Sequence, residues 1–330
     1  MKTNNIIEEI KSKLTGNKDQ DVPYLHEELR KYQKENNFDV VLKIQLLLFN
    51  YLSKEEKEKL NSDANNMLKE HKNKYDTALE YLNFGDIDRA QKILIELFDT
   101  YERVGKINGA NFYDFEEPIE HFIHFGSFSK LRSAHIKKVP EPVIKYAYQI
   151  ASIYLEKNDV RSAITYLEKS LLFNPVCQYI LQELVELYIS INNYEDAFNY
   201  LKKVIKYAYT KQQLAFGYKK LGMYYRHKGI YNKAIASFAI SNLYLDDIDN
   251  KIQIKEITSI VGQIKFSSAE EILSLFKEDE INYGPSKHVI DTFNDFIEYA
   301  KASKDKKTLL YVGKIAFALT EEQYYKELIK

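Results

Sequence analysis

The sequence predicts an all-α fold, a right-handed α-α superhelix of stacked helical hairpins. One unit of about 34 residues is written three times between Ile144 and Asp246. Apolar residues recur three and four positions apart in each copy, which is the spacing of one face of a helix. No stretch of the chain shows the alternating apolar and polar pattern of a strand. The expected architecture is therefore a solenoid in which each hairpin buries its apolar face against its neighbours.

The spacing inside the unit is the same in each copy. The first copy carries Ile150, Ala151, Tyr154, Ala163 and Leu167. The second has its counterparts 34 positions further on, at Leu184, Val185, Tyr188, Ala197 and Leu201. The third follows after a three-residue insertion, at Leu221, Gly222, Tyr225, Ala234 and Phe238. A small residue early in the second helix lets the two helices of a hairpin approach closely, so the pattern has a steric reason.

This pattern resembles the tetratricopeptide repeat (TPR), which has a period of 34 residues. The resemblance implies a solenoid of helix-turn-helix units that serves as a scaffold for protein interactions. From Val139 onward, the chain also resembles an uncharacterised family of bacterial cytosolic TPR proteins. Its landmarks are 173–176 (FNPV), 206–210 (KYAYT) and 283–286 (YGPS). The second resemblance implies no known activity.

Around the three clear repeats at 144–248, we expect further helices in order along the chain. Residues 1–20 predict a short helix and a link, and 21–104 predict helical hairpins with a degenerate repeat at 71–104. Within them, Ser53 and Glu56 form a capping box for a helix ending near Leu60, and another helix runs from Asp63 to Phe84. Residues 105–143 predict a divergent hairpin with a loop, of which 111–138 continue the series.

C-terminal hairpins and a capping helix are expected over 249–330. Two further capping boxes are predicted there, Ser267 with Glu270 and Thr320 with Gln323. The second of these pairs would open a closing helix at 321–328.

Bulk composition bounds the partners. The chain has 47 basic and 48 acidic residues, a formal net charge of -1, so nothing in its charge favours nucleic acid or an anionic membrane. A single cysteine, Cys177, excludes an internal disulfide and suits a reducing compartment. The first residues lack the pattern of a signal peptide, and no apolar run reaches the length of a membrane span. We therefore expect a cytoplasmic protein.

Residue patterns for chemistry are weak. Glu117, Glu120, His121 and His124 share one helical face and could hold a divalent metal, but ordinary surface pairs explain the spacing equally simply. Cys177 has no neighbouring histidine, and the glycines form no phosphate-binding loop. We therefore expect no enzyme activity, no metal and no cofactor.

The first helix of each TPR hairpin lines a concave groove in the family, and its positions 2, 5, 9 and 12 point inward. From these positions we predict binding residues at Lys145, Tyr148, Ser152, Tyr179, Gln182, Glu186, Phe216, Lys219, Met223 and Arg226. Position 12 of the first two repeats holds Leu155 and Ile189. Such a mixture of aromatic, aliphatic and polar groups suits an extended or helical peptide. The alternative is that the apolar members pack only against neighbouring helices and the charged members are solvated.

Chaperone-binding TPR domains hold a terminal carboxylate with Lys and Asn at two positions of the first repeat, Asn in the second, and Lys and Arg in the third. The corresponding residues here are Tyr148, Ser152, Glu183, Lys219 and Met223, and only Lys219 matches. The sequence therefore argues against that clamp.

The function expected from sequence is a non-enzymatic scaffold that binds a peptide or protein segment in its groove. The alternative is a peptide-pheromone receptor or response-regulator phosphatase of the TPR type. Gln45 lies in a helical N-terminal segment that faintly resembles that of the phosphatases, in which a glutamine directs the attacking water.

Overall fold

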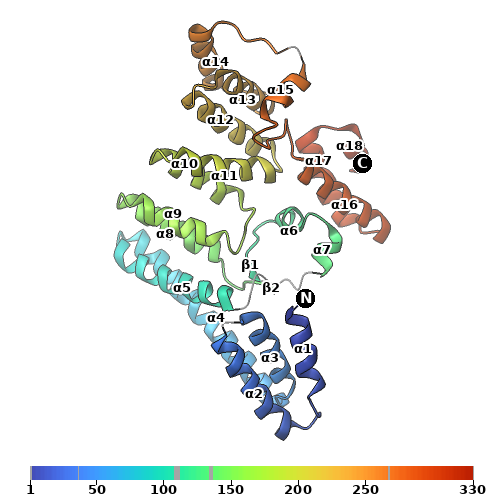
Figure 1. Cartoon of the computed structure of the whole chain (residues 1–330). Helices are drawn as coiled ribbons and strands as arrows, with labels where there is room; N and C mark the ends of the chain where they lie inside the picture. The colour runs from blue at the N-terminus through green and yellow to red at the C-terminus, as the bar shows by residue number, and fades with distance from the viewer. Residues whose placement is uncertain (1, 36, 108–111, 134–136, 267, 330) are drawn as a thin grey trace. The chain divides into compact units, whose positions relative to one another are not determined.

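A computed structural model describes residues 2–35, 37–107, 112–133, 137–266 and 268–329. The chain divides into two compact units, Met1–Asp114 with Ile136–Lys157, and Phe115–His135 with Asn158–Lys330. Helices make up both units (Figure 1), which confirms the predicted all-α class. Of the helices in the described part of the chain, none is both long and apolar enough to cross a membrane.

The first unit begins with three short helices, α1 (Lys2–Ser12), α2 (Lys18–Lys34) and α3 (Phe38–Asn50). Ile7, Leu25, Val40 and Ile44 form their shared core and are almost fully buried. Asp21 ties the link before α2 to the end of α3, because it accepts hydrogen bonds from Gly16 N and the Tyr51 hydroxyl at 2.8 and 2.6 Å.

A long hairpin follows, of α4 (Lys54–Asn83) and α5 (Ile87–Ile107). Ser53 and Glu56 form the predicted capping box at its start. The predicted break between Leu60 and Asp63 is wrong, since α4 continues through it. Nothing in 60–63 forbids a helix, because this stretch contains neither proline nor glycine.

The hairpin packs against α8 (Val143–Glu156). The rings of Tyr75 on α4 and Tyr146 on α8 lie 4.8 Å apart. Between α5 and α8, β1 (Phe112–Tyr113) pairs in parallel with β2 (Lys137–Lys138). The expectation of no strands is therefore wrong at this point, although each strand is too short to show an alternating pattern.

The second unit carries successive helices (Figure 1): α9 (Val160–Ser170), α10 (Gln178–Ser190), α11 (Tyr194–Tyr207), α12 (Lys211–His227), α13 (Tyr231–Tyr244), α14 (Ile248–Val261) and α15 (Ala269–Phe276). Helices α10 with α11, and α12 with α13, form hairpins that contain the second and third sequence copies. The repeating residues of these copies, Leu184, Ala197, Leu221 and Ala234, are almost fully buried. The apolar periodicity of the sequence therefore marks the core.

A shared carboxylate connects neighbouring helices of the series. Glu168 of α9 accepts hydrogen bonds from the hydroxyls of Tyr188 on α10 and Tyr200 on α11, at 2.6 and 2.8 Å. The two rings also stack, with centroids 5.6 Å apart. Burial and this carboxylate both raise the pKa of the two phenols, so they remain hydrogen-bond donors at neutral pH.

The second unit also contains α6 (Pro118–Phe125), α7 (Phe128–Ser133), α16 (Lys287–Ser303), α17 (Lys306–Thr320) and α18 (Gln323–Leu328). Helices α6 and α7 pack against α16 (Figure 1). Phe122 stacks on Phe296, and Phe128 stacks on Tyr299, with ring centroids 3.8 and 3.3 Å apart. In the described part of 111–138, α6 and α7 contact each other and also this helix far along the chain, and the expectation that the segment continues the hairpin series stays a prediction.

The caps of the last helices differ by a few residues from the prediction. Helix α15 is capped by Ser268, whose side chain accepts from Glu271 N, while the predicted Ser267 lies outside the described residues. Thr320 ends α17 and does not open α18, whose N-cap is Glu322. Glu321 adopts a left-handed conformation at this turn, with φ of 59°. The predicted capping box of Thr320 with Gln323 is therefore wrong, because Thr320 belongs to the end of α17 and Gln323 to the start of α18.

Candidate peptide-binding face

The predicted binding residues on α10 and α12 form one half-buried face. These residues are neither fully exposed nor part of the core. They are Tyr179, Gln182, Glu186, Phe216, Lys219, Met223 and Arg226. We call this surface, together with the adjoining side of α14, the first-helix face.

Two of its cations are bound by α14. Lys219 Nζ lies 2.7 Å from Asp247 and 3.2 Å from Asp249, and Arg226 lies 2.8 Å from Glu256 and also donates to Gln253. The hydrogen bond from Lys219 lowers the pKa of Asp247, and Asp247 in turn raises the pKa of Lys219. Both cations therefore form ion pairs with α14 within the chain itself.

A signal for these pairs was present in the sequence. Lys219 and Arg226 are seven positions apart on α12, and Asp249 and Glu256 are seven positions apart on α14. Seven residues are nearly two helical turns, so each pair lies on one face. Opposite charges at the same spacing on α12 and α14 therefore predict the two ion pairs, Lys219 with Asp249 and Arg226 with Glu256.

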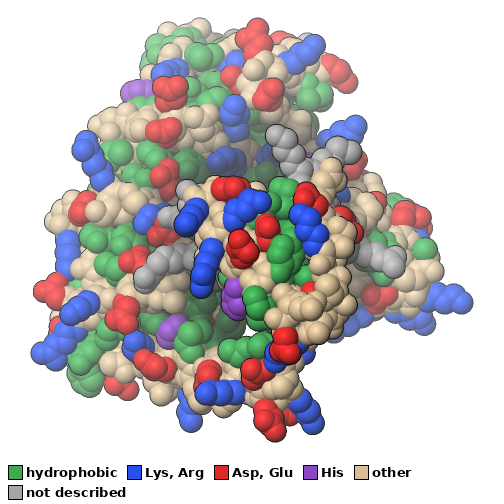
Figure 2. All heavy atoms as spheres, turned by 60° about the horizontal axis from the view of Figure 1, so that its bottom comes forward, with side chains coloured by type: hydrophobic (Ala, Val, Ile, Leu, Met, Phe, Trp, Pro, Cys, Tyr) green, Lys and Arg blue, Asp and Glu red, His purple; other side chains and the backbone are tan. Residues whose placement is uncertain are grey.

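Glu186 is the one carboxylate among the remaining members of the face on α10 and α12. Glu186 forms an ion pair with Lys220, at 2.5 Å. Glu183, one residue after Gln182, belongs to no ion pair among the described residues, and burial raises its pKa. Acidic and basic side chains are mixed over the side of the molecule seen in Figure 2. The first-helix face departs from that mixture by its surplus of acidic groups.

The other predicted residues, Lys145, Tyr148 and Ser152, lie on α8 in the first unit. Lys145 and Tyr148 are exposed, and the Ser152 hydroxyl donates to the Tyr148 carbonyl at 3.0 Å. Their part in a shared groove stays a prediction.

A cavity of about 460 Å³ opens where α6, α10 and α12 begin. Tyr179 and Gln182, two of the predicted residues, line it together with side chains that sequence reasoning did not select. The additional lining residues are Glu116, Glu117, Glu120, Gln178, Tyr209, Thr210, Gln212 and Gln213. We call this space the acidic cavity.

Glu120 is buried in the wall of the acidic cavity. Its Oε2 accepts hydrogen bonds from Asn174 Nδ2 at 2.9 Å and from the backbone N–H groups of Glu116 and Glu117 at 3.0 and 3.2 Å. Oε1 accepts none from the residues that the structure describes. Burial raises the pKa of this carboxyl group, although the three hydrogen bonds oppose the rise.

The same contacts separate the residues that share one helical face in the sequence and were considered as metal ligands. Glu120 turns to Asn174, while the His121 and His124 rings pack near Phe115, at centroid distances of 4.4 and 5.6 Å. Burial lowers the pKa of His124. Over the described part of the chain, no three histidine, cysteine or acidic side chains are grouped as metal ligands.

Gln178 also lines the acidic cavity and is only 4% exposed. Its Nε2 donates to the Val204 carbonyl at 3.2 Å, which fixes the orientation of the amide, because the reverse orientation would place two oxygens together. Its Oε1 has no hydrogen-bond partner among the described residues. A buried acceptor of this kind costs stability unless a donor reaches it.

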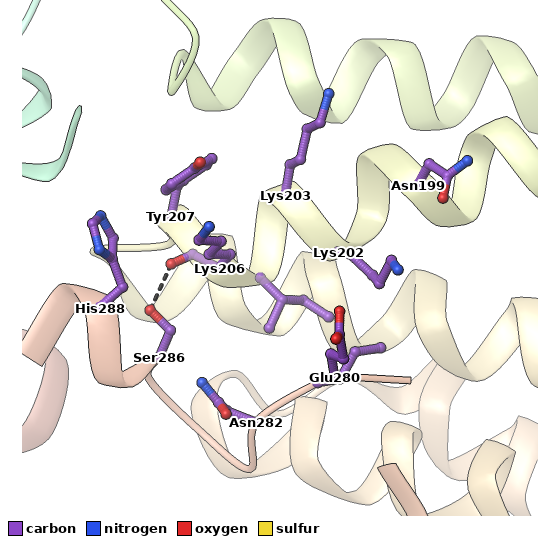
Figure 3. A pocket seen from close by; sticks show the side chains of 11 residues that line it. Asn199, Lys202, Lys203, Lys206, Tyr207, Glu280, Asn282, Ser286 and His288 are labelled. Atoms are coloured by element: carbon purple, nitrogen blue, oxygen red, sulfur yellow. Dashed lines mark hydrogen bonds between the residues drawn. The ribbon is translucent and has the colours of Figure 1, made fainter. Parts of the chain in front are cut away.

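A larger cavity of about 670 Å³ lies beside α11 (Figure 3). Lys202, Lys203 and Lys206 line it, and each ammonium group lies over an aromatic ring of α11, 4.6 to 5.5 Å from the centroid. Ser286 donates to the Lys206 carbonyl at 2.6 Å, and a His288 ring nitrogen lies 2.7 Å from the Ile123 carbonyl. Ser286 and His288 are therefore engaged within the protein, whereas the three lysines are flexible.

Two other residues singled out from sequence have plain environments. Cys177 is fully buried at the start of α10, and burial strongly raises the pKa of its thiol, so it is no nucleophile in this state. Gln45 lies exposed on α3. The phosphatase alternative stays a prediction.

Comparisons with known proteins agree with the repeat pattern. The tetratricopeptide repeat family model matches residues 144–177 and 179–210. No curated protein matches the chain.

Several solved structures resemble the chain at low identity. MamA protein is 14% identical, over 74% of this chain and 97% of its own, with a TM-score of 0.33. The pilF protein of Pseudomonas aeruginosa is 12% identical, over 78% of this chain and 95% of its own, with a TM-score of 0.37. A tetratricopeptide repeat protein from Parabacteroides merdae is 16% identical, over 78% of this chain and 97% of its own, with a TM-score of 0.32.

The matched segments carry the expected helices: α8 and α9 in the first, and the α10–α11 hairpin in the second. The third sequence copy adds the α12–α13 hairpin with the same buried positions. The chain therefore contains tetratricopeptide repeats.

Proposed function

We propose that this protein is a non-catalytic scaffold whose first-helix face binds a peptide segment of a partner protein. The observation that carries the proposal is the half-buried state of all seven predicted residues on α10 and α12. A side chain that only packs in the core would be buried, and a side chain that is only solvated would be exposed. Side chains that are partly buried have already lost part of their conformational freedom, so binding orders them at a lower entropic cost.

The chemistry of the face supports a peptide as the guest. Tyr179, Phe216 and Met223 offer two aromatic rings and a flexible thioether, which are the side chains enriched at protein interfaces. Gln182 offers an amide that can donate to and accept from a peptide backbone. Because Lys219 and Arg226 already pair with α14, they position the face and are not its principal contacts.

A selection of displayed peptides on the immobilised full chain tests the proposal. Binders are then measured by fluorescence anisotropy against Phe216→Ala and Met223→Ala, which remove apolar contact area without breaking an ion pair. We expect each variant to weaken binding about tenfold, since loss of a well-packed interface side chain costs about 1 to 2 kcal/mol. Leu172→Ala is the control, because Leu172 is 58% exposed and lies outside the first-helix face.

The proposal fails if the selected peptides bind Phe216→Ala and Met223→Ala as tightly as the unaltered chain. It also fails if the Leu172→Ala control weakens binding equally, because the binding would then have no preference for this face. Circular dichroism on each variant establishes that the helical content is retained.

A further inference from the structure

We propose that the acidic cavity binds the charged end of a basic side chain, arginine or lysine, belonging to the bound peptide. The inference rests on the proposed function and gives the partner a chemistry. Tyr179 and Gln182 belong both to the first-helix face and to the wall of the cavity, so a peptide on the face has a direct route into it.

Gln178 supplies the first reason. Its Oε1 is a buried acceptor with no donor from the described residues, and the Val204 carbonyl prevents the amide from turning over. A ligand group that contacts this oxygen has to donate a hydrogen bond. Guanidinium and ammonium groups are donors only, whereas a carboxylate or phosphate would place a further acceptor against Oε1.

Glu120 supplies the second reason. Three hydrogen bonds hold its carboxyl group in one orientation through Oε2, and Oε1 accepts nothing from the described residues. A carboxylate fixed by its surroundings loses little freedom when a cation binds it. Glu116 and Glu117 are exposed at the mouth and add two carboxyl groups to the same wall.

The helix N-termini near the cavity disfavour a cation, but their effect is weaker than that of the glutamates. Helices α6, α10 and α12 begin here, and each N-terminus carries roughly half a positive charge. Part of that charge is met by internal caps, including the Gln213 side chain, which accepts from Tyr209 N and Thr210 N. The three glutamate side chains outweigh the remainder, so the cavity favours a cation.

Size and shape fit a single side chain. A volume of about 460 Å³ admits a guanidinium group with its methylene stem but not a folded segment. The rings of Tyr179 and Tyr209 line the walls, and aromatic faces attract cations. We expect arginine to bind more tightly than lysine, because its planar fork can donate to Glu120 and Gln178 together.

The test uses pooled decapeptides in which one central position is fixed as arginine, citrulline, lysine or glutamate and the others are mixtures. Citrulline has the shape of arginine without its charge. We expect the arginine pool to bind the full chain at least tenfold more tightly than the citrulline pool. Free agmatine is titrated in parallel, with the Gln178 side-chain amide followed by NMR, to separate the cavity from the peptide.

Matched variants locate the effect. Glu120→Gln removes the charge while its amide oxygen can still accept the three hydrogen bonds, and Glu117→Gln removes a charge at the mouth. We expect the first to abolish the preference for arginine over citrulline and the second to reduce it about threefold. Glu195→Gln makes the same chemical change on the exposed surface of α11 and should leave the preference intact.

The outcomes separate the two proposals. Pools that bind with no preference for arginine overturn the basic-residue inference and leave peptide binding standing. Agmatine that shifts the Gln178 amide while no pool binds supports the cavity and overturns the peptide proposal. If the Glu120→Gln variant still prefers arginine, another surface recognises the charge, and the basic-residue inference is overturned.

Discussion

The ring of Phe238 occupies the space that a side chain on Gly222 would need. A Cβ atom placed on Gly222 would lie 2.7 Å from the Phe238 ring, well inside van der Waals contact. The equivalent pairs in the other repeats are Ala151 with Leu167 and Val185 with Leu201. The third repeat therefore has a smaller residue at the first of these positions and a larger residue at the second.

This relationship predicts a compensated pair. Gly222→Ala should lower the free energy of unfolding by about 1 to 3 kcal/mol, because the added methyl group overpacks a closed core. Combined with Phe238→Leu, the same change should cost less than the sum of the two single changes. A double-mutant cycle by urea denaturation measures the coupling, and additive effects would contradict the account.

A second prediction concerns Asp279, which joins α12 and α13 to the turn after α15. Its carboxylate lies 2.5 Å from the Tyr225 hydroxyl and 2.6 Å from Lys233 Nζ. Asp279→Asn should lower the free energy of unfolding by about 1 to 3 kcal/mol, since it leaves a largely buried ammonium group without its counter-charge. The control is Asp246→Asn, whose pair with Lys251 is exposed on both sides and should change stability by less than about 1 kcal/mol.

A third prediction uses the raised pKa of Glu120. A carboxyl group with a higher pKa in the folded protein than in the unfolded chain stabilises the fold at low pH, and that contribution is lost as pH rises from the unfolded value through the folded one. Stability measured upward from pH 4.5 should therefore fall more for the unaltered protein than for Glu120→Gln.

The groups around Glu120 allow this reading. Cys177 and Tyr209 stay neutral because burial raises their pKa far above this range, so Glu116 and Glu117 are the other carboxyl groups of the cavity wall. Repeating the comparison in the Glu117→Gln background checks for their share. Equal slopes for the unaltered protein and Glu120→Gln would contradict the prediction.

A fourth prediction concerns the contact between α6 and α16. Phe296→Ala should lower the free energy of unfolding by about 3 to 5 kcal/mol, because the ring is fully buried against Phe122. Hydrogen exchange should then quicken in α6 as well as in α16. Leu310→Ala, at an exposed site on α17, should affect neither, and unchanged exchange in α6 would show that the two helices are independently stable.

The repeating part of the fold could be predicted from sequence because its cause is local. Small and large apolar residues at fixed spacing bring neighbouring helices together, and Ala197, Leu201 and Ala234 are buried as that spacing requires. The pairing of α6 with α16 could not be predicted in this way. It depends on Phe122 and Phe296, which carry no shared pattern and lie far apart along the chain.

The candidate site was predicted only in outline. Tyr179 and Gln182 followed from their positions in the repeat, but Glu120 and Gln178 did not. Glu120 read as one member of a surface cluster, and its burial depends on Asn174 from another segment. The partners of Lys219 lie at the start of α14, so they follow only from comparing the spacing of charges on two helices.

The packing of α6 and α7 on α16 has a consequence for synthesis on the ribosome. His288 reaches the Ile123 carbonyl from 165 positions further along the chain. Translation proceeds at roughly 5 to 20 residues per second, so the apolar surface of Phe122 and Phe128 stays exposed for about 10 to 30 seconds before α16 is synthesised. The nascent chain therefore exposes an apolar surface on α6 and α7 until α16 has been synthesised, which gives chaperones a defined early target.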